Sequence, residues 1–331
     1  MNNKKIVIIP VFCESHLIKY QIPNIIDTID PDYIIYNEGM FPVGPESSTV
    51  VDKTFLNKYT LNGEGKRGFD YPELKKIINN AQKLYPNTKI ILNNMEYRDS
   101  SASVNYVHAC SNFDELGINI QRGDYIFPYE GDVFHHENSK EDIKEYLNQI
   151  KPNEGFRSKW IDFIENQYYA EKSSLKPFIW QNIKNSNPNW ENQGRSRKIC
   201  IRFGDMETYK SIILNFESQK YEMLYPTDLI TYHYAWWRLG KYKELRFKQL
   251  NRHPLYWEYF QKGLSKIKEN KYLDIDVRPG MGPNSIESTF RYIRFFNIDH
   301  PKHIKSHPCY VEELDKLKIK DINNNELTFI Q

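Results

Sequence analysis

The first 140 residues alternate between short apolar runs and segments with helical spacing, and this alternation limits the fold more than any other feature. KIVIIPVF at Lys5–Phe12 is a continuous run rich in β-branched residues, typical of a strand buried on both faces. In Ser15–Ile29 the apolar residues recur at helical spacing. Further strands are predicted at 33–36, 89–92 and 125–129, and further helices at 73–84 and 103–116.

Strands that alternate with helices predict an α/β fold with a Rossmann-type, mostly parallel sheet. A long loop rich in Gly, Pro, Ser and Asn is expected at 37–70. The second half is less regular, with a helix predicted at 156–171, strands at 198–203 and 229–234, a basic helical region at 241–271 and a helix at 285–296. We therefore expect one α/β domain over 1–240, followed by a helical and loop-rich C-terminal elaboration over 241–331.

Composition excludes several classes of protein. An apolar fraction of 40% argues against disorder, and no apolar run approaches the ~18 residues of a membrane span. The four cysteines lie far apart and match no metal-site spacing, which favours reduced thiols and a cytoplasmic protein, or one in the host cytoplasm if the chain is viral. A net charge of +2 does not point to nucleic acid as a required partner.

Polar residues follow three of the predicted strands, at Cys13–Glu14, Asn37–Glu38 and Glu130–Asp132. Ligands of parallel α/β sheets bind beyond the carboxyl ends of the strands. Glu130 and Asp132 are two residues apart, so in an extended segment both carboxylates point the same way. Gly131 is expected to let a ligand approach the backbone. Oxygen ligands of this kind suit Mg²⁺ or Mn²⁺ holding a diphosphate.

His135, His136 and Glu137 follow directly. Together with Asp132 they form a conceivable zinc site. We expect His135 to pack in the core, and the sequence leaves the role of His136 open.

The segment TYHYAWWR at Thr231–Arg238 carries a second set of candidates. On a strand, His233 faces away from both neighbouring tyrosines, and its imidazole can complete a metal shell begun by carboxylates. The indole of Trp236 can stack on a sugar, and Arg238 can fork onto phosphate. Lys248, further along, can bring a second positive charge to a leaving diphosphate.

These segments, in this order, resemble GT-A-type glycosyltransferases, in particular family-2-like enzymes of bacteria and viruses. The matching blocks are IVIIPVFCES, GDYIFPYEGDVFHHE, TYHYAWWR followed by Lys248, and Ser306-His307-Pro308. One departure is the acidic motif, which is E-G-D here where the family has D-x-D.

The resemblance implies transfer of a hexosyl or pentosyl group from a nucleotide sugar, with a UDP-sugar as the expected donor. Asp132 and Glu130 would hold Mn²⁺ or Mg²⁺, with His233 as a third contact. The acceptor would be a glycan or a hydroxymethylated base of viral DNA. Around the nucleotide the resemblance places Pro10, Glu14, Asn37, Glu38, Arg98 and Asn105, with Trp236, Arg238 and Lys248 on the donor.

Inverting transfer needs a general base, for which the candidates are Asp205 and Glu207 after the strand KICIRF, or Glu217. The order of the segments favours Asp205 or Glu207. The competing interpretation of these two residues is an acidic cap on the next helix. Two other functions also compete. One is a catalytically inactive protein that binds nucleotide sugars or glycans, and the other is a zinc hydrolase built on Asp132, His135 and His136.

Overall fold

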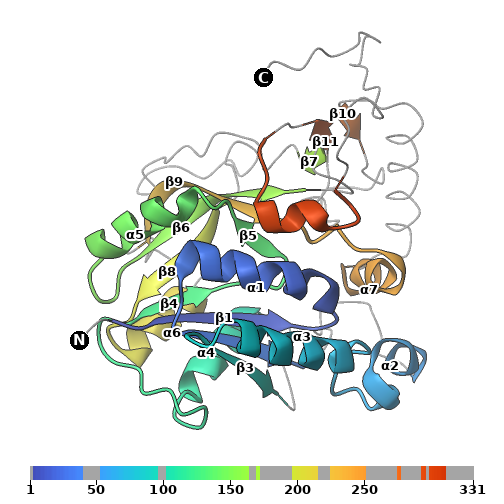
Figure 1. Cartoon of the computed structure of the whole chain (residues 1–331), viewed down its shortest axis with the longest axis horizontal. Helices are drawn as coiled ribbons and strands as arrows, with labels where there is room; N and C mark the ends of the chain where they lie inside the picture. Colours follow the sequence, from blue (N-terminus) through green and yellow to red (C-terminus); the bar gives the residue numbers. More distant parts are fainter. Residues whose placement is uncertain are drawn as a thin grey trace.

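The fold is a layered α/β structure built on one large mixed sheet (Figure 1). In the described part of the chain this sheet has eight strands in the order β3-β2-β1-β4-β8-β6-β9-β5. The computed structural model describes residues 3–39, 53–95, 102–163, 169–171, 196–214, 224–250, 274–276, 292–295 and 298–310.

The first half of the sheet is parallel. Strand β1 (Lys5–Val11) lies between β2 (Tyr33–Glu38) and β4 (Tyr125–Pro128), and β3 (Lys89–Asn94) pairs with the far side of β2. Residues 6–11 of β1 are buried, as expected for a strand covered on both faces. The predicted α/β fold with a Rossmann-type sheet is therefore confirmed.

The second half of the sheet mixes directions. Strand β8 (Ser196–Arg202) runs antiparallel to β4 and to β6 (Gly155–Asp162). Strand β9 (Leu224–His233) is parallel to β6, and β5 (Val133–His135) pairs antiparallel with β9 at the sheet edge. A small antiparallel sheet holds β7 (Tyr169–Glu171), β11 (Tyr292–Phe295) and β10 (Asp274–Asp276).

Helices cover both faces of the large sheet (Figure 1). One face packs against α1 (Ser15–Ile29), α3 (Tyr71–Leu84) and α5 (Ser139–Gln149). The other face packs against α4 (Ala102–Ser111) and α6 (Met206–Leu214). Alternate residues of β1 face the two cores, with Val7 and Ile9 on the α1 side and Ile6 and Ile8 on the α4 side. The remaining helices are α2 (Lys53–Tyr59), η1 (Leu61–Gly63), α7 (Gly240–Leu250) and η5 (Lys302–Ser306).

Three expectations from the sequence need correction. The predicted helix at 156–171 is wrong over β6, where Arg157 and Ser158 are buried between neighbouring strands and hide the alternation of a strand. The predicted helix at 285–296 is wrong over β11. The predicted loop at 37–70 contains α2 and η1, and its residues 40–52 lie outside the described residues.

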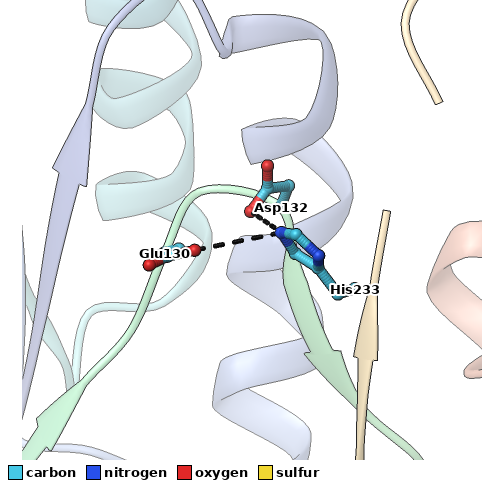
Figure 2. Close-up of side chains that lie close together, drawn as sticks. All are labelled: Glu130, Asp132 and His233. Atoms are coloured by element: carbon cyan, nitrogen blue, oxygen red, sulfur yellow. Dashed lines mark ion pairs between the residues drawn. The ribbon is translucent and has the colours of Figure 1, made fainter. Parts of the chain in front are cut away.

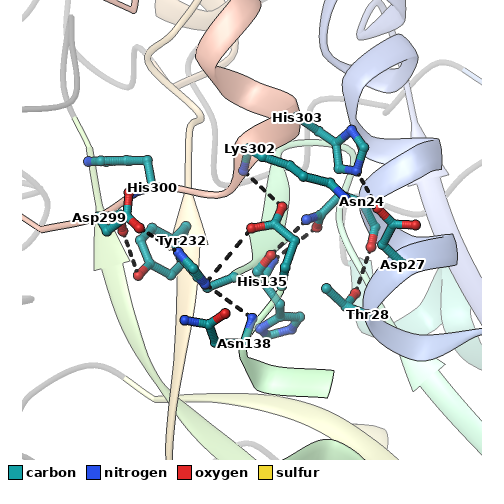
Figure 3. A network of polar contacts seen from close by, with 12 residues as sticks. Asn24, Asp27, Thr28, His135, Asn138, Tyr232, Asp299, His300, Lys302 and His303 are labelled. Atoms are coloured by element: carbon teal, nitrogen blue, oxygen red, sulfur yellow. Dashed lines mark hydrogen bonds and ion pairs between the residues drawn. The ribbon is translucent and has the colours of Figure 1, made fainter. Parts of the chain in front are cut away.

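The segment 298–310 contacts α1 and β9 through a network of polar interactions (Figure 3). His303 Nε2 lies 2.7 Å from Asp27 Oδ2 on α1, and Tyr232 on β9 donates its hydroxyl to the backbone oxygen of Asp299 at 2.9 Å. His300 Nδ1 lies 2.6 Å from the hydroxyl of Tyr234. This segment therefore ties the end of β9 to α1. Among the described residues, no helix combines the length and apolarity that a membrane crossing requires.

His135 on β5 is buried, with Nδ1 3.1 Å from the carbonyl of Ile230, and burial lowers its pKa to about 4. In the unfolded chain a histidine protonates near pH 6.5, so between about pH 6.5 and 4 the unfolded state binds more protons. Unfolding free energy should fall across that window by on the order of 3 kcal/mol from this residue.

His135→Gln should flatten this acid dependence, as measured by urea unfolding at pH values from 7 to 4. Part of the slope should remain, because burial also lowers the pKa of His307 to about 4. An unchanged pH dependence of the unfolding free energy in the variant would show that His135 is not its source.

Candidate metal centre

Two carboxylates and one imidazole meet at the carboxyl edge of the sheet (Figure 2). Glu130 and Asp132 lie on the loop between β4 and β5, and His233 is the last residue of β9. One ligand atom from each lies within 4.8 Å of the other two. His233 Nε2 is 3.1 Å from Asp132 Oδ1 and 3.9 Å from Glu130 Oε2. The structure thus brings together the three residues that the sequence analysis assigned to the metal.

Strand register explains why these residues meet. The antiparallel β5–β9 pair places Val133 opposite His233, and the backbone nitrogen of Tyr234 donates to the carbonyl of Asp132 at 2.8 Å. Asp132 and His233 are therefore direct neighbours, although they lie far apart in the sequence.

Two buried amide side chains of α1 hold the loop that carries the carboxylates. Gln21 donates Nε2 to the carbonyls of Glu130 at 2.5 Å and Val133 at 3.0 Å. Asn24 donates Nδ2 to the carbonyl of His135 at 2.7 Å and accepts from its backbone nitrogen at 3.0 Å. The two amides satisfy backbone groups of the loop that a regular neighbouring strand would otherwise satisfy. The apolar spacing of α1 does not predict this role.

Arg238 is the buried counter-charge of the site. Its Nη2 donates to Asp132 Oδ2 at 3.0 Å and to Glu14 Oε1 at 2.7 Å, and its Nε donates to the carbonyl of Ala235 at 2.8 Å. Burial opposes its charge, but Glu14 and Asp132 outweigh burial and raise the pKa of Arg238. The sequence predicts that this arginine contacts phosphate. In the structure it pairs with two carboxylates and orients Asp132.

Gly131 serves packing within the protein. A Cβ built at this position would overlap Glu14 Oε2 and approach Ile18. The expectation that Gly131 leaves space for a ligand is therefore corrected: the space is filled by the Glu14 carboxylate that pairs with Arg238.

Asp162 holds His233 through the second ring nitrogen, Nδ1. Its Nδ1 is hydrogen-bonded to Asp162 Oδ1, and the same oxygen accepts the indole N–H of Trp160 at 2.7 Å. Burial lowers the pKa of His233, but Asp132 and Asp162 outweigh burial, and the net shift is upward. Asp162 ends strand β6, but its role is not visible in the sequence because the pattern of 156–171 predicts a helix.

The donor set fits a divalent ion. Two carboxylates supply hard oxygen ligands, and one imidazole favours Mn²⁺ or another transition metal over Mg²⁺. Nε2 of His233 is buried and faces Asp132 Oδ1 and Glu130 Oε2, so this nitrogen can ligate an ion held by the two carboxylates.

The residues expected around the nucleotide lie at the ends of β1 and β2. Pro10 is in register with Asn37, whose Oδ1 accepts from Asn93 Nδ2 at 2.9 Å. Glu38 Oε1 accepts from the backbone nitrogen of Gly68 at 2.8 Å. These residues and Glu14 share the carboxyl edge of the parallel strands with the metal-ligand set.

Asp205 and Glu207 do not join this site. Strand β8 runs antiparallel, so they lie near the start of β4, where Phe203 donates its backbone nitrogen to the carbonyl of Asp124. Asp205 instead accepts from the backbone nitrogen of Thr208 at 2.8 Å and from Asn153 Nδ2 at 2.8 Å. These bonds, the one from Thr208 foremost, lower its pKa. This placement favours the capping interpretation and argues against either residue as general base.

The other candidates are placed as follows. His135 packs in the core as expected, and His136 Nε2 lies 3.1 Å from Asp299 Oδ2, so neither joins Asp132 in a zinc site. Trp236 is buried, so it does not offer an exposed face to a sugar. Lys248 lies in α7 and Asn105 in α4, and Arg98 and Glu217 lie outside the described residues.

Gly131→Ala should destabilise the protein by about 1–3 kcal/mol, because the new methyl group displaces Glu14 from Arg238. In a Glu14→Ala background the same change should cost much less, giving a coupling energy of about 0.5–3 kcal/mol between the two positions. Urea unfolding of the wild type, both single variants and the double variant measures this. Strictly additive losses would show that Glu14 does not fill the space beside Gly131.

Comparisons with known proteins leave the family open. No protein-family model matches the chain, and no curated protein matches it. Among solved structures, one titled 4-diphosphocytidyl-2C-methyl-D-erythritol synthase aligns with a TM-score of 0.33 and 10% identity. The alignment covers 69% of this chain and 90% of that one. A likeness this weak carries no argument about function.

Proposed function

We propose that this protein transfers a sugar from a nucleotide-diphosphate sugar to a hydroxyl acceptor, with a divalent metal ion at the diphosphate. The observation that carries the proposal is the convergence of Glu130, Asp132 and His233 at the carboxyl edge of a Rossmann-type sheet. That edge is where parallel α/β sheets bind their ligands, and nucleotides are frequent among them.

The charges of the site suit a diphosphate held through a cation. Glu130 and Asp132 are acidic, so they would repel a diphosphate directly, and Arg238 is already paired with Glu14 and Asp132. A bound Mn²⁺ supplies the positive charge that stabilises a leaving diphosphate. The protein holds these ligands in place: Gln21 fixes the loop that carries the two carboxylates, and the β5–β9 pairing fixes His233 beside it.

The nucleoside is proposed to lie along the ends of β1 and β2, next to this centre. Asn37 is buried there, and its Nδ2 finds no hydrogen-bond partner among the described residues. A buried donor of this kind fits a carbonyl oxygen of a nucleobase. Uracil offers such oxygens, and we propose a UDP-sugar as the donor to be tried first.

For the acceptor we propose a glycan before DNA. Binding to a DNA backbone draws on an excess of positive charge, and this chain carries a net charge of only +2. A hydroxymethylated base in viral DNA stays as the second acceptor to be tried, and binding that weakens steeply with rising salt would favour it.

The test is a thermal-shift screen of UDP-sugars with and without Mn²⁺, followed by assay of sugar release and transfer. A ligand at 100 times its Kd stabilises the folded state by about 2.7 kcal/mol. The shift should require both Mn²⁺ and the nucleotide sugar, and Asp132→Ala should abolish it. Asp114→Ala, an exposed aspartate in a distant loop, is the matched control and should leave it unchanged.

Two outcomes would overturn the proposal in different ways. A full Mn²⁺-dependent shift in Asp132→Ala would remove the metal assignment. Metal-dependent binding without any sugar release or transfer would support a protein that binds nucleotide sugars and lacks catalysis.

A further inference from the structure

We propose that Asp162 is a positioning residue for the metal centre. It holds His233 as the tautomer with a proton on Nδ1, so that the lone pair of Nε2 points at the ion. This inference rests on the proposed metal-dependent function, and it concerns a residue that the sequence analysis did not single out.

The strand pairing builds this contact. In the parallel β6–β9 pair Asp162 is the register partner of His233, so their side chains leave the same face of the sheet next to each other. The backbone nitrogen of Phe163 donates to the carbonyl of His233 at 2.9 Å, which fixes the two strand ends together. Asp162 is 3% exposed and His233 6%, so water does not compete strongly for either group.

The chemistry of the partners decides which ring nitrogen carries the proton. An ionised carboxylate only accepts hydrogen bonds, so the bond between Asp162 Oδ1 and His233 Nδ1 requires a proton on Nδ1. In the neutral ring the lone pair is then on Nε2. That nitrogen faces Asp132 Oδ1 at 3.1 Å and Glu130 Oε2 at 3.9 Å, which are the other two members of the ligand set.

Trp160 in turn holds Asp162. Its indole N–H donates to Asp162 Oδ1 at 2.7 Å, and its ring lies 4.1 Å from the imidazole of His233, centroid to centroid. Trp160, two residues before Asp162 on β6, therefore contacts both the Asp162 carboxylate and the His233 imidazole. A carboxylate behind a ligating histidine fixes its orientation and makes the imidazole a stronger donor.

The experiment measures Mn²⁺ affinity of the whole protein by titration calorimetry and by the electron paramagnetic resonance signal of free Mn²⁺. Asp162→Leu removes the acceptor while keeping a side chain that branches at Cγ, and should weaken Mn²⁺ binding on the order of 10- to 100-fold. Asp162→Asn should have a smaller effect, because its amide oxygen still accepts from both Trp160 and His233. Trp160→Phe keeps the carboxylate and the ring, and should have the smallest effect of the three.

A double-variant cycle separates positioning from a general effect of the buried charge. In a His233→Ala background Asp162 has no imidazole to orient, so Asp162→Leu should cause little further loss of Mn²⁺ affinity. If the two losses add fully, Asp162 acts on the ion or on the fold without His233, and the inference is wrong.

A second readout needs no metal. Nitrogen-15 NMR of the metal-free protein, at a pH where the ring of His233 is neutral, should show the proton on Nδ1 in the wild type. The same spectrum should show a shift toward the Nε2 tautomer in Asp162→Leu, or in Asp162→Ala if the leucine variant does not fold. Retention of the Nδ1 tautomer without the carboxylate would overturn the inference.

The two proposals fail separately. If wild-type protein binds no Mn²⁺ or other divalent ion, the proposed function and this inference both fall. If the wild type binds Mn²⁺ and the Asp162 variants bind it equally well, the inference alone is overturned and the proposed function stands.

Discussion

The buried guanidinium of Arg238 between Glu14 and Asp132 is the interaction on which the rest of the site depends. It joins three segments that the chain brings together from far apart: the start of α1, the loop after β4 and the residues after β9. A buried charge is tolerated only when it is paired and hydrogen-bonded, so none of the three groups is stable there without the others. The pairing also leaves Asp132 Oδ1 facing His233, and so links the stability of the fold to the geometry of the candidate metal ligands.

A second constraint comes from the position of β9 between β6 and β5. His233 ends this strand with an aspartate on either side, Asp162 from β6 and Asp132 from the loop before β5. One nitrogen of the ring contacts each carboxylate. The imidazole therefore transmits the position of one strand end to the ligand set on the other, and a change of register in either pair would separate them.

Much of this arrangement could be predicted from sequence, and the rest could not for physical reasons. Local periodicity was sufficient for β1 and α1. The rule that ligands gather at the carboxyl ends of parallel strands pointed to Glu130 and Asp132, whereas His233 was assigned as a third contact through the resemblance of its segment. Elsewhere the missing information was the direction of the strands. Asp205 follows a strand as Glu130 does, but β8 is antiparallel, so the same rule places it at the opposite edge. Asp162 was hidden because β6 is buried on both faces and carries polar residues inside. The partners of Arg238 depend on tertiary contacts that no local pattern contains.

The amide clamps on the loop after β4 have a consequence for how an ion would enter. Gln21 and Asn24 fix the backbone on both sides of the two carboxylates before any metal arrives. The ligand set is thus preorganised, and little conformational entropy remains to be lost on binding. The rate and selectivity of metal uptake would then be governed by how readily the incoming ion sheds its water, rather than by rearrangement of the chain. A rigid cage of this kind discriminates between ions by size and coordination geometry, because it cannot adjust to the wrong one.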